Sequence, residues 1–219
     1  MDGHGRTRAR VLGALLTAGL AVALSACSSD ASSGPAVPGF PEAGAAAASS
    51  APPSRTTLLP TDCNQLLSKD ELPNLLGMPL GSVNSTSLRD VPAPSVGRLE
   101  RVTCNYTSLG GPAAPAANTV VLKVLSSGYT TPAAAQAQAQ VNNQVEQSSG
   151  VQGTATPIGA AASTYFSDPD GPVLVVVYGR VTTSLTLSPT GPVAAAQARS
   201  VLVDLAQRVL PVLVPAGNP

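Results

Sequence analysis

The residues of this chain that could carry chemistry are three cysteines, one histidine and a small number of acidic and basic side chains. A cysteine thiol can be acylated, can form a disulfide, or can act as a nucleophile where its surroundings lower its pKa. The cysteines are Cys27, Cys63 and Cys104, and the histidine is His4. Their positions along the chain decide which of these reactions each one can undergo.

Cys27 ends an apolar run that follows three arginines near the N-terminus. The run covers residues 11–24, which is shorter than the about 20 apolar residues of a transmembrane helix. It has the organisation of a secretory signal peptide. The residues L-S-A then lead into Cys27, a pattern that resembles the bacterial lipobox, in which the thiol receives a diacylglycerol and becomes the new N-terminus. We therefore predict a lipoprotein signal peptide over residues 1–26 and lipidation, palmitate included, at Cys27.

The alternative for Cys27 is an ordinary signal peptide with an unpaired cysteine beside it. Lipidation explains the cysteine better, because exported proteins seldom leave a thiol unpaired. Two or three acyl chains would hold the protein at the membrane, since each buried CH₂ contributes about 0.8 kcal/mol. The expected location is the extracytoplasmic face of the cell membrane, with the membrane itself as a partner through Cys27.

Cys63 and Cys104 remain once Cys27 is acylated. An even number of cysteines in an exported domain predicts a disulfide. A redox-active pair would normally lie close in sequence, as in C-x-x-C, and these two do not. We predict a structural Cys63–Cys104 bond.

Common catalytic and cofactor motifs are missing from the sequence. His4 lies in the segment expected to be removed, so catalysis through histidine and histidine metal sites are excluded for the mature chain. No G-x-S-x-G or S-x-x-K motif is present, and no glycine loop fits a phosphate. Asp168 and Asp170 could form a calcium ligand pair, but D-P-D-G is typical of a turn. We predict no catalytic residue, no metal and no cofactor, and therefore not an enzyme.

Three arginines near a Pro/Gly-rich loop, Arg89, Arg98 and Arg101, are the candidate ligand-binding residues. They could bind an anionic lipid headgroup or a glycan. Asp90 and Glu100 lie among them, which favours a solvated loop of mixed charge. Four of the six aromatic side chains could line an apolar pocket, although core packing is the default for residues on strands; they are Tyr106, Tyr165, Phe166 and Tyr178.

The charge balance argues against nucleic acid as a partner. The full chain has 12 basic and 12 acidic residues. Loss of residues 1–26 takes away three arginines and one aspartate and leaves a formal net charge of −2. A nucleic-acid binder needs a basic patch, which this composition does not provide. We expect a monomer whose partner is an envelope protein, a lipid or a glycan.

Composition divides the chain into three parts. Residues 1–26 are the signal peptide, and residues 27–60 are a Ser/Ala/Pro/Gly-rich segment with no periodic apolar face, which predicts a disordered tether after the lipidated cysteine. Residues 61–219 have the size of one domain with a core.

The pattern within residues 61–219 predicts an α+β domain: one antiparallel sheet with about three helices packed on it. The leucine-rich segment at residues 61–81 reads as two short helices or one kinked at Pro73, with a Ser68/Glu71 capping box. Strands are expected at R-V-T-C-N-Y-T, N-T-V-V-L-K-V-L-S, P-V-L-V-V-V-Y and V-T-T-S-L-T-L-S. Gly179 and Arg180 suit a two-residue hairpin loop.

Two further helices are expected to pack through apolar stripes. In the first, Thr131 is a candidate N-cap, and the expected buried residues are Ala137, Val141 and Val145. In the closing helix we expect Pro211 to be the stop. Its expected stripe is Ala194, Ala198, Val201, Leu202, Leu205 and Val209.

These elements carry a family resemblance. The pattern resembles a family of actinobacterial envelope lipoproteins classed as a domain of unknown function. It consists of Cys63, Leu66-Leu67, Glu71-Leu72, Leu76-Gly77 and Cys104-x-Tyr106. More distantly, the chain is similar to the extracellular sensor domains of mycobacterial serine/threonine kinases. Members of the lipoprotein family often carry tryptophan at the position of Tyr106, and the kinase domains have a second disulfide that this chain cannot form. The resemblance implies an α+β fold and a surface role, and brings no catalytic residue.

Three classes of function stay open. The first is a non-catalytic binding or sensing module at the envelope, which predicts a cleft without converging titratable groups. The second is a lipid or glycolipid carrier, which needs an apolar cavity of several hundred cubic ångströms between sheet and helices. The third is an enzyme of unrecognised type, which needs carboxylates converging in a pocket.

Overall fold

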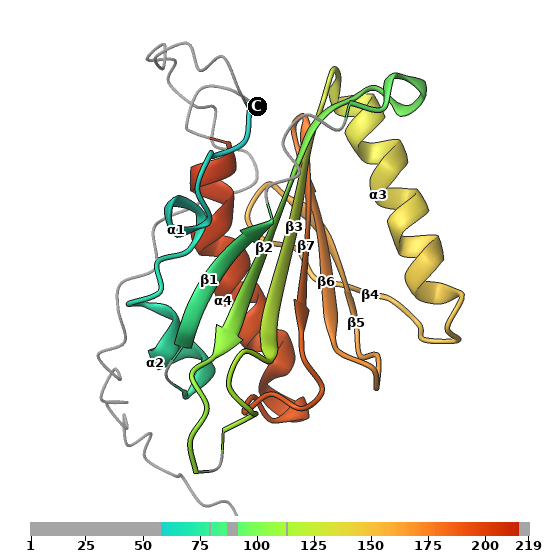
Figure 1. The fold of residues 1–219 in the computed structure, drawn as a ribbon. Coiled ribbons are helices and arrows are strands. Elements are labelled where there is room, and N and C mark those ends of the chain that lie inside the picture. The colour runs from blue at the N-terminus through green and yellow to red at the C-terminus, as the bar shows by residue number, and fades with distance from the viewer. Residues whose placement is uncertain (1–57, 79, 87–91, 113, 215–219) are drawn as a thin grey trace, which may run out of the picture. The chain divides into compact units, whose positions relative to one another are not determined.

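The computed structural model describes residues 58–78, 80–86, 92–112 and 114–214. They belong to one compact unit within residues 34–219. Their centre is a seven-stranded sheet in which every neighbouring pair is antiparallel. Helices pack on both faces of this sheet (Figure 1), so the α+β prediction is confirmed. Lipidation at Cys27, the signal peptide and most of the expected tether lie outside the described residues.

The strand order across the sheet is β1-β2-β3-β7-β6-β5-β4. The strands are β1 (Leu80–Thr86), β2 (Arg98–Ser108), β3 (Val120–Tyr129), β4 (Thr154–Ala155), β5 (Ala162–Phe166), β6 (Val173–Tyr178) and β7 (Val181–Leu187). The helices are α1 (Cys63–Leu66), α2 (Leu72–Leu76), the 3-10 turn η1 (Pro94–Val96), α3 (Pro132–Gln147) and α4 (Ala195–Leu213). In Figure 1, α3 covers one face of the sheet, and α4 covers the other together with α1.

The leucine-rich start of the domain forms two short helices, which was one of the two predicted alternatives. Pro73 lies in the first turn of α2, where its missing N–H disturbs no helical hydrogen bond. The expected Ser68/Glu71 capping box is wrong. The Ser68 hydroxyl accepts from the N–H of Asp70, and Glu71 makes no side-chain cap bond. Gly77 ends α2 with a φ of 68°, a left-handed conformation that suits glycine.

The predicted disulfide is present and joins α1 to the sheet. Cys63 and Cys104 are bonded at an S–S distance of 2.00 Å. Tyr106, two residues further along β2, donates its hydroxyl hydrogen to the carbonyl of Cys63 at 3.1 Å. All three side chains are buried, and together they link the N-terminal helices to the second strand.

The packed domain includes residues before position 61. Leu59 is buried in the main core, and the backbone N–H groups of Leu58 and Leu59 both donate to the carboxylate of Glu100 on β2. The packed residues therefore extend to the N-terminal side of the domain boundary predicted at position 61. Glu100 is engaged by this segment.

The two faces of the sheet differ in chemistry. The face toward α4 carries buried Val102, Cys104, Tyr106, Leu122, Val124, Leu174, Val176, Leu185 and Leu187. The alternate residues point the other way, toward α3, and on β2, β3 and β7 many of them are polar, such as Thr103, Lys123 and Ser184. The main core therefore lies between the sheet and α4, and α3 packs on the more polar face.

The β6–β7 hairpin is closed by Gly179 and Arg180 as predicted. Gly179 has a φ of 52°, and Arg180 is not among the residues with positive φ. A positive first and a negative second position fit the type II′ turn. The hairpin places all of β6 against β7, and residues 173–176 are buried.

Helix α3 begins where the sequence predicts but buries a different face. Thr131 caps it by accepting from the N–H of Ala134 at 3.1 Å. The expected stripe of Ala137, Val141 and Val145 is wrong: Val141 is 49% and Val145 is 62% exposed. The buried residues are Ala135 and Ala139. A short connection from β3, with Ala134 close to Gly97, sets this rotation of the helix.

Helix α4 matches its predicted stripe in the middle and departs from it at both ends. Ala198, Leu202, Leu205 and Val209 are buried as expected. Ala194 is the exposed N-cap, outside the buried stripe. Pro211 does not stop the helix, which runs on to Leu213.

The extension of α4 past Pro211 has a packing reason. Leu213 and Val214 beyond the proline are both buried in the core. Their burial offsets the backbone hydrogen bond that the proline cannot donate. Within the described ranges, no helix combines the length and the apolar character needed to cross a membrane.

Candidate functional site

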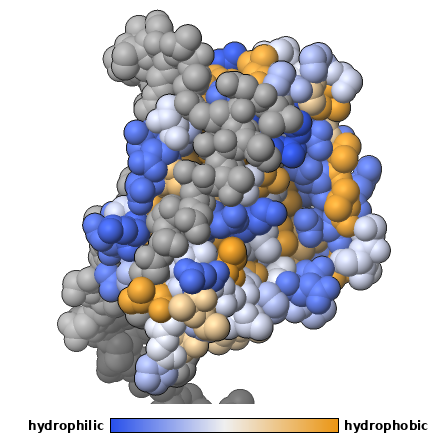
Figure 2. Space-filling model, viewed as in Figure 1, coloured by the Kyte–Doolittle hydropathy of each residue, from blue (hydrophilic) through white to orange (hydrophobic). Residues whose placement is uncertain are grey.

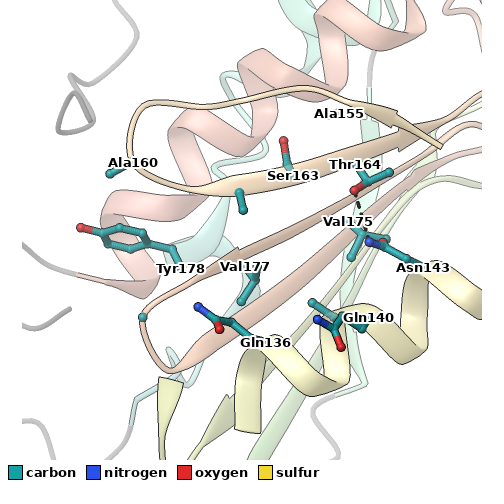
Figure 3. Close-up of a pocket in the computed structure, with 13 residues that line it drawn as sticks. Gln136, Gln140, Asn143, Ala155, Ala160, Ser163, Thr164, Val175, Val177 and Tyr178 are labelled. Atoms are coloured by element: carbon teal, nitrogen blue, oxygen red, sulfur yellow. Dashed lines mark hydrogen bonds between the residues drawn. The ribbon is translucent and has the colours of Figure 1, made fainter. Parts of the chain in front are cut away.

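A groove lies between α3 and the β5–β6 part of the sheet. Its volume is about 570 Å³, within the range of small-molecule sites. Figure 3 shows Gln136, Gln140 and Asn143 along the helix wall of this groove, facing the strands. The groove is lined by Gln136, Ala139, Gln140, Asn143, Ala155, Ala160, Ala162, Ser163, Thr164, Val175, Val177, Tyr178 and Gly179.

Small residues on α3 create this groove. Ala135 and Ala139 are the buried residues of α3, and their small side chains let the helix lie close to the sheet. Residues three and four apart lie on one side of a helix. Gln136, Gln140 and Asn143 therefore form a row beside the alanine contact, above Val175 and Val177 of β6. The helix provides a wall of amides, and the strands provide an apolar floor.

The amides on the two sides of α3 differ in their partners. On the side away from the groove, the Gln138 amide donates to the Asn142 side chain at 3.0 Å. On the groove side, the side chains of Gln136 and Gln140 have no hydrogen-bond partner among the described residues, and both are exposed. Each retains one carbonyl acceptor and one NH₂ donor for a ligand.

Asn143 connects the helix wall to the strand. Its amide nitrogen donates to the Thr164 hydroxyl at 3.2 Å, so the Thr164 hydroxyl keeps its own hydrogen for another acceptor. The Asn143 carbonyl oxygen is buried and has no partner in the described part of the chain. An unpaired buried acceptor costs about 1–3 kcal/mol. Asn143 is therefore held at the groove at some expense to stability.

The lining carries no charged side chain. One carboxylate in an unusual environment, that of Glu146, lies at the C-terminal end of α3. Burial, and secondarily the charge of Asp168, raise the pKa of Glu146 above its usual range. Asp168 accepts a hydrogen bond from Ser149 at 3.0 Å. The Ser149–Asp168 hydrogen bond links the residues after α3 to the β5–β6 turn, and both acidic residues lie outside the groove lining.

The four aromatic residues do not form one pocket. Tyr106 and Phe166 are fully buried. Tyr165 lies under the guanidinium of Arg199, 6.0 Å from the ring centroid, and burial raises its pKa. Tyr178 is half-buried and lines the groove near Gln136, at the opposite end from the Asn143–Thr164 pair (Figure 3).

Arg98 and Arg101, two of the three predicted ligand residues, come close together on β2 and lie on a strand, contrary to the expected loop. The Arg101 side chain donates to the Ser127 hydroxyl at 3.3 Å. Burial, and then the charge of Arg98, lower the pKa of Arg101. Glu100, which lies between them in the sequence, accepts hydrogen bonds from the backbone N–H groups of Leu58 and Leu59. Arg89 lies outside the described residues.

The arginines and the groove are separate sites. Arg101 pairs in register with Ser127, which pairs with Thr182, then Val177 and Ala162. Ser127 and Thr182 are buried, whereas Val177 and Ala162 line the groove. Strands β3 and β7 therefore separate Arg101 from the groove. A ligand-binding role for Arg98 and Arg101 stays a prediction.

The acidic residues of the D-P-D-G segment act as a turn. The Asp168 carboxylate accepts from the N–H of Asp170 at 2.7 Å, and the carbonyl of Asp168 accepts from the N–H of Gly171. No group of three or more metal-ligating side chains occurs among the described residues. A second hollow beside this turn, bordered by Tyr165 and Pro189, has a volume of about 210 Å³, below the usual size of a ligand site.

Sequence reasoning missed the groove residues because it placed the glutamines on a solvated face. The available signal was Ala135 and Ala139 four residues apart, flanked by Gln136, Gln140 and Asn143. Alanine pairs at this spacing allow a helix to approach a sheet closely. Because Val141 and Val145 are more apolar than alanine, the prediction placed the buried face on the other side of the helix.

The surface over α3 mixes apolar and polar residues (Figure 2), in keeping with the exposure of Val141 and Val145. A scan against protein-family models and a search of curated proteins found no match to the chain.

Proposed function

We propose that this chain is a non-catalytic binding or sensing protein of the cell envelope, held at the membrane by a lipid on Cys27, and that its ligand occupies the groove between α3 and β5–β6. The observation that carries the proposal is the row formed by Gln136, Gln140 and Asn143. Two of these amides have no partner among the described residues, and the third has a buried carbonyl without a donor. The two exposed amides of this row, Gln136 and Gln140, are available for recognition.

The composition of the groove supports binding more than catalysis. General acid–base and nucleophilic catalysis use groups that exchange protons or attack a substrate, commonly His, Asp, Glu, Lys or Cys. The lining consists of amides, hydroxyls, small apolar side chains and one tyrosine. These groups can hold and orient a ligand.

The groove supports the carrier alternative less well. A carrier of lipid chains needs an apolar cavity, and here the polar residues Gln136, Gln140, Asn143, Ser163 and Thr164 share the lining with alanine and valine. An acyl chain packed into the groove would approach these amides without offering them hydrogen bonds.

Membership of the actinobacterial envelope lipoprotein family is part of the proposal. The residues that carry the resemblance, Cys63, Cys104 and Tyr106, form one buried cluster through the disulfide and a hydrogen bond. A motif that fixes the N-terminal helices to the sheet would stabilise the same fold in every member of the family. The similarity to kinase sensor domains stays the more distant part of the proposal.

Native mass spectrometry of the full chain, purified in detergent from its own host, tests this function. The variant Ala162→Phe places a large ring on an exposed position of the groove. We expect a bound ligand on the wild-type chain that is absent from Ala162→Phe. A ligand retained equally by both would show that the groove is not the site. Reproducible hydrolysis of ester, peptide or glycoside substrates by the wild type, abolished by one substitution, would overturn the non-catalytic role.

A further inference from the structure

The groove has a chemistry that restricts its ligand, and this step rests on the proposed function. Its lining is uncharged, so no ionic group of a ligand would find a counter-charge there. A charged ligand would lose hydration on entering without an ion pair in return. The ligand expected from the lining is neutral and rich in hydrogen-bonding groups.

The free groups of the groove are individual amides and hydroxyls that both donate and accept. Gln136 and Gln140 each present an acceptor oxygen and two donor hydrogens, and Thr164 has a free hydroxyl hydrogen. Neighbouring hydroxyls of a sugar ring likewise donate and accept. One amide can therefore bond two adjacent sugar hydroxyls, one through its oxygen and one through its nitrogen.

The spacing and the floor of the groove suit a chain of rings. Gln136 and Gln140 are one helical turn apart, about 6 Å along the axis, comparable to the length of one pyranose ring. Opposite them, Val175, Val177 and Ala162 form a floor without charges. A sugar ring has an apolar C–H face that can rest on this floor while its edge hydroxyls reach the amides. The volume of about 570 Å³ leaves room for more than one ring.

An extended peptide fits the groove less well. Peptide strands usually bind by pairing with a free sheet edge. In the groove, β5 pairs with β6 on one side and with β4 on the other. Beyond β4, the N–H of Thr156 bonds the carbonyl of Ser163. The backbone of β5 is therefore already engaged there, and the free groups are side chains.

We propose that the groove between α3 and β5–β6 binds an uncharged oligosaccharide, with its ring hydroxyls bonded by the Gln136 and Gln140 amides and by the Thr164 hydroxyl. Asn143 is a positioning residue that holds the Thr164 hydroxyl through the 3.2 Å hydrogen bond. Because no ion pair takes part, binding should change little with salt concentration.

Titration calorimetry of the full chain with neutral disaccharides and trisaccharides tests the proposal, using maltose, cellobiose, trehalose and chitotriose as probes at up to about 10 mM. We expect at least one probe to bind. The double variant Gln136→Ala/Gln140→Ala should weaken its affinity by at least about tenfold, since two hydrogen bonds are lost. Gln144→Ala is the matched control. It makes the same change on an exposed position of α3 outside the groove, and should bind like the wild type.

All three positions are exposed, so circular dichroism should show these variants folded. Equal binding by the double variant and the wild type, or an equal loss in Gln144→Ala, would overturn the assignment of the amides. If no probe binds but Ala162→Phe releases a peptide or a lipid in mass spectrometry, the saccharide inference fails and the proposed function stands. If no probe binds and no ligand depends on the groove, both fail.

Discussion

Cys63 and Cys104 are the residues whose removal should change stability most. Their disulfide closes a loop with a sequence separation of 41. The chain-entropy relation gives about 4 kcal/mol for a loop of this length. The variant Cys63→Ala/Cys104→Ala should therefore lower the melting temperature by roughly 10 °C. The melting temperature of the wild type should fall by a similar amount under reducing conditions. If neither the double variant nor the reduced wild type shows a lower melting temperature, the bond has no structural role.

Tyr106 should link stability to alkaline pH. Its hydroxyl is buried and donates to the Cys63 carbonyl, and burial raises the pKa of this phenol far above its ordinary value. Because the pKa is higher in the folded state, Tyr106 makes its full contribution to the free energy of unfolding below about pH 10, the ordinary pKa of the phenol in the unfolded chain. This contribution decreases as the pH rises past that value. Tyr106→Phe should cost about 0.5–1.5 kcal/mol at pH 7.

The same variant should also lose part of this alkaline destabilisation. Urea unfolding of Tyr106→Phe and the wild type from pH 7 to above pH 10 measures both effects. Parallel pH profiles of the two proteins would show that Tyr106 is not the titrating group.

Glu146 should oppose folding at neutral pH. Its raised pKa means that the folded state disfavours the carboxylate, mainly through burial and secondarily through the charge of Asp168. The contribution of Glu146 to the free energy of unfolding is therefore most favourable below its pKa in the unfolded state. It is lost as the pH rises through its pKa in the folded state. Solvent screens this partly exposed carboxylate, so Glu146→Gln should be only slightly more stable than the wild type at pH 7, and the gain should vanish near pH 4. Thermal melts across this range, with Gln147→Ala as a neighbouring control, measure it.

At the scale of elements, the rotation of α3 makes the most direct prediction. Val141 and Val145 are exposed, whereas Ala135 is buried. Val141→Gln and Val145→Gln should each change the free energy of unfolding by less than about 0.5 kcal/mol. Ala135→Leu should lower it by about 1–3 kcal/mol, because Ala135 is fully buried outside the groove lining and the larger side chain has no room there. If urea unfolding shows a larger loss of stability for the valine variants than for the alanine variant, the valine stripe is the packing face.

Helix α4 shows how an element can override a local signal. A proline inside a helix removes one backbone donor and clashes with the preceding turn, which favours an end at Pro211. The chain continues helically because Leu213 and Val214 gain burial in the main core. Tertiary burial of two apolar side chains outweighs one missing hydrogen bond.

At the scale of the whole molecule, the prediction concerns attachment to the membrane. If Cys27 carries acyl chains, the intact mass of the detergent-extracted chain should exceed that of the polypeptide starting at Cys27. Cys27→Ser should move the protein out of the detergent phase, because the acyl chains provide the affinity for the bilayer. Ser29→Ala, two residues away, should stay with the membrane. An unmodified Cys27 in the wild type would remove the anchor from the proposed function.

Local sequence patterns predicted the class of the fold, strands β2, β3, β6 and β7, the Thr131 cap of α3 and the disulfide. They missed β1, β4 and β5, and the capping box that they predicted at Ser68 and Glu71 is wrong. The features predicted correctly depend on local rules: alternation along β2, Thr131 before Pro132, Gly179 in a two-residue loop, and the even cysteine count after Cys27. The first three rules concern residues that are close in sequence. The disulfide follows because each of the two remaining cysteines has only the other as a possible partner. The structure confirms these features within the described residues.

Which face of α3 meets the sheet, and with it the position of the groove, follows from packing between segments that are distant in sequence. The valine stripe and the alanine pair are both consistent with a helix, and the choice depends on the connection from β3 and on the polar face that the helix meets. The groove combines α3 with β5 and β6, which are separated from it in sequence and carry no motif of their own. Contacts between such distant segments follow from strand order and packing, which local patterns do not encode.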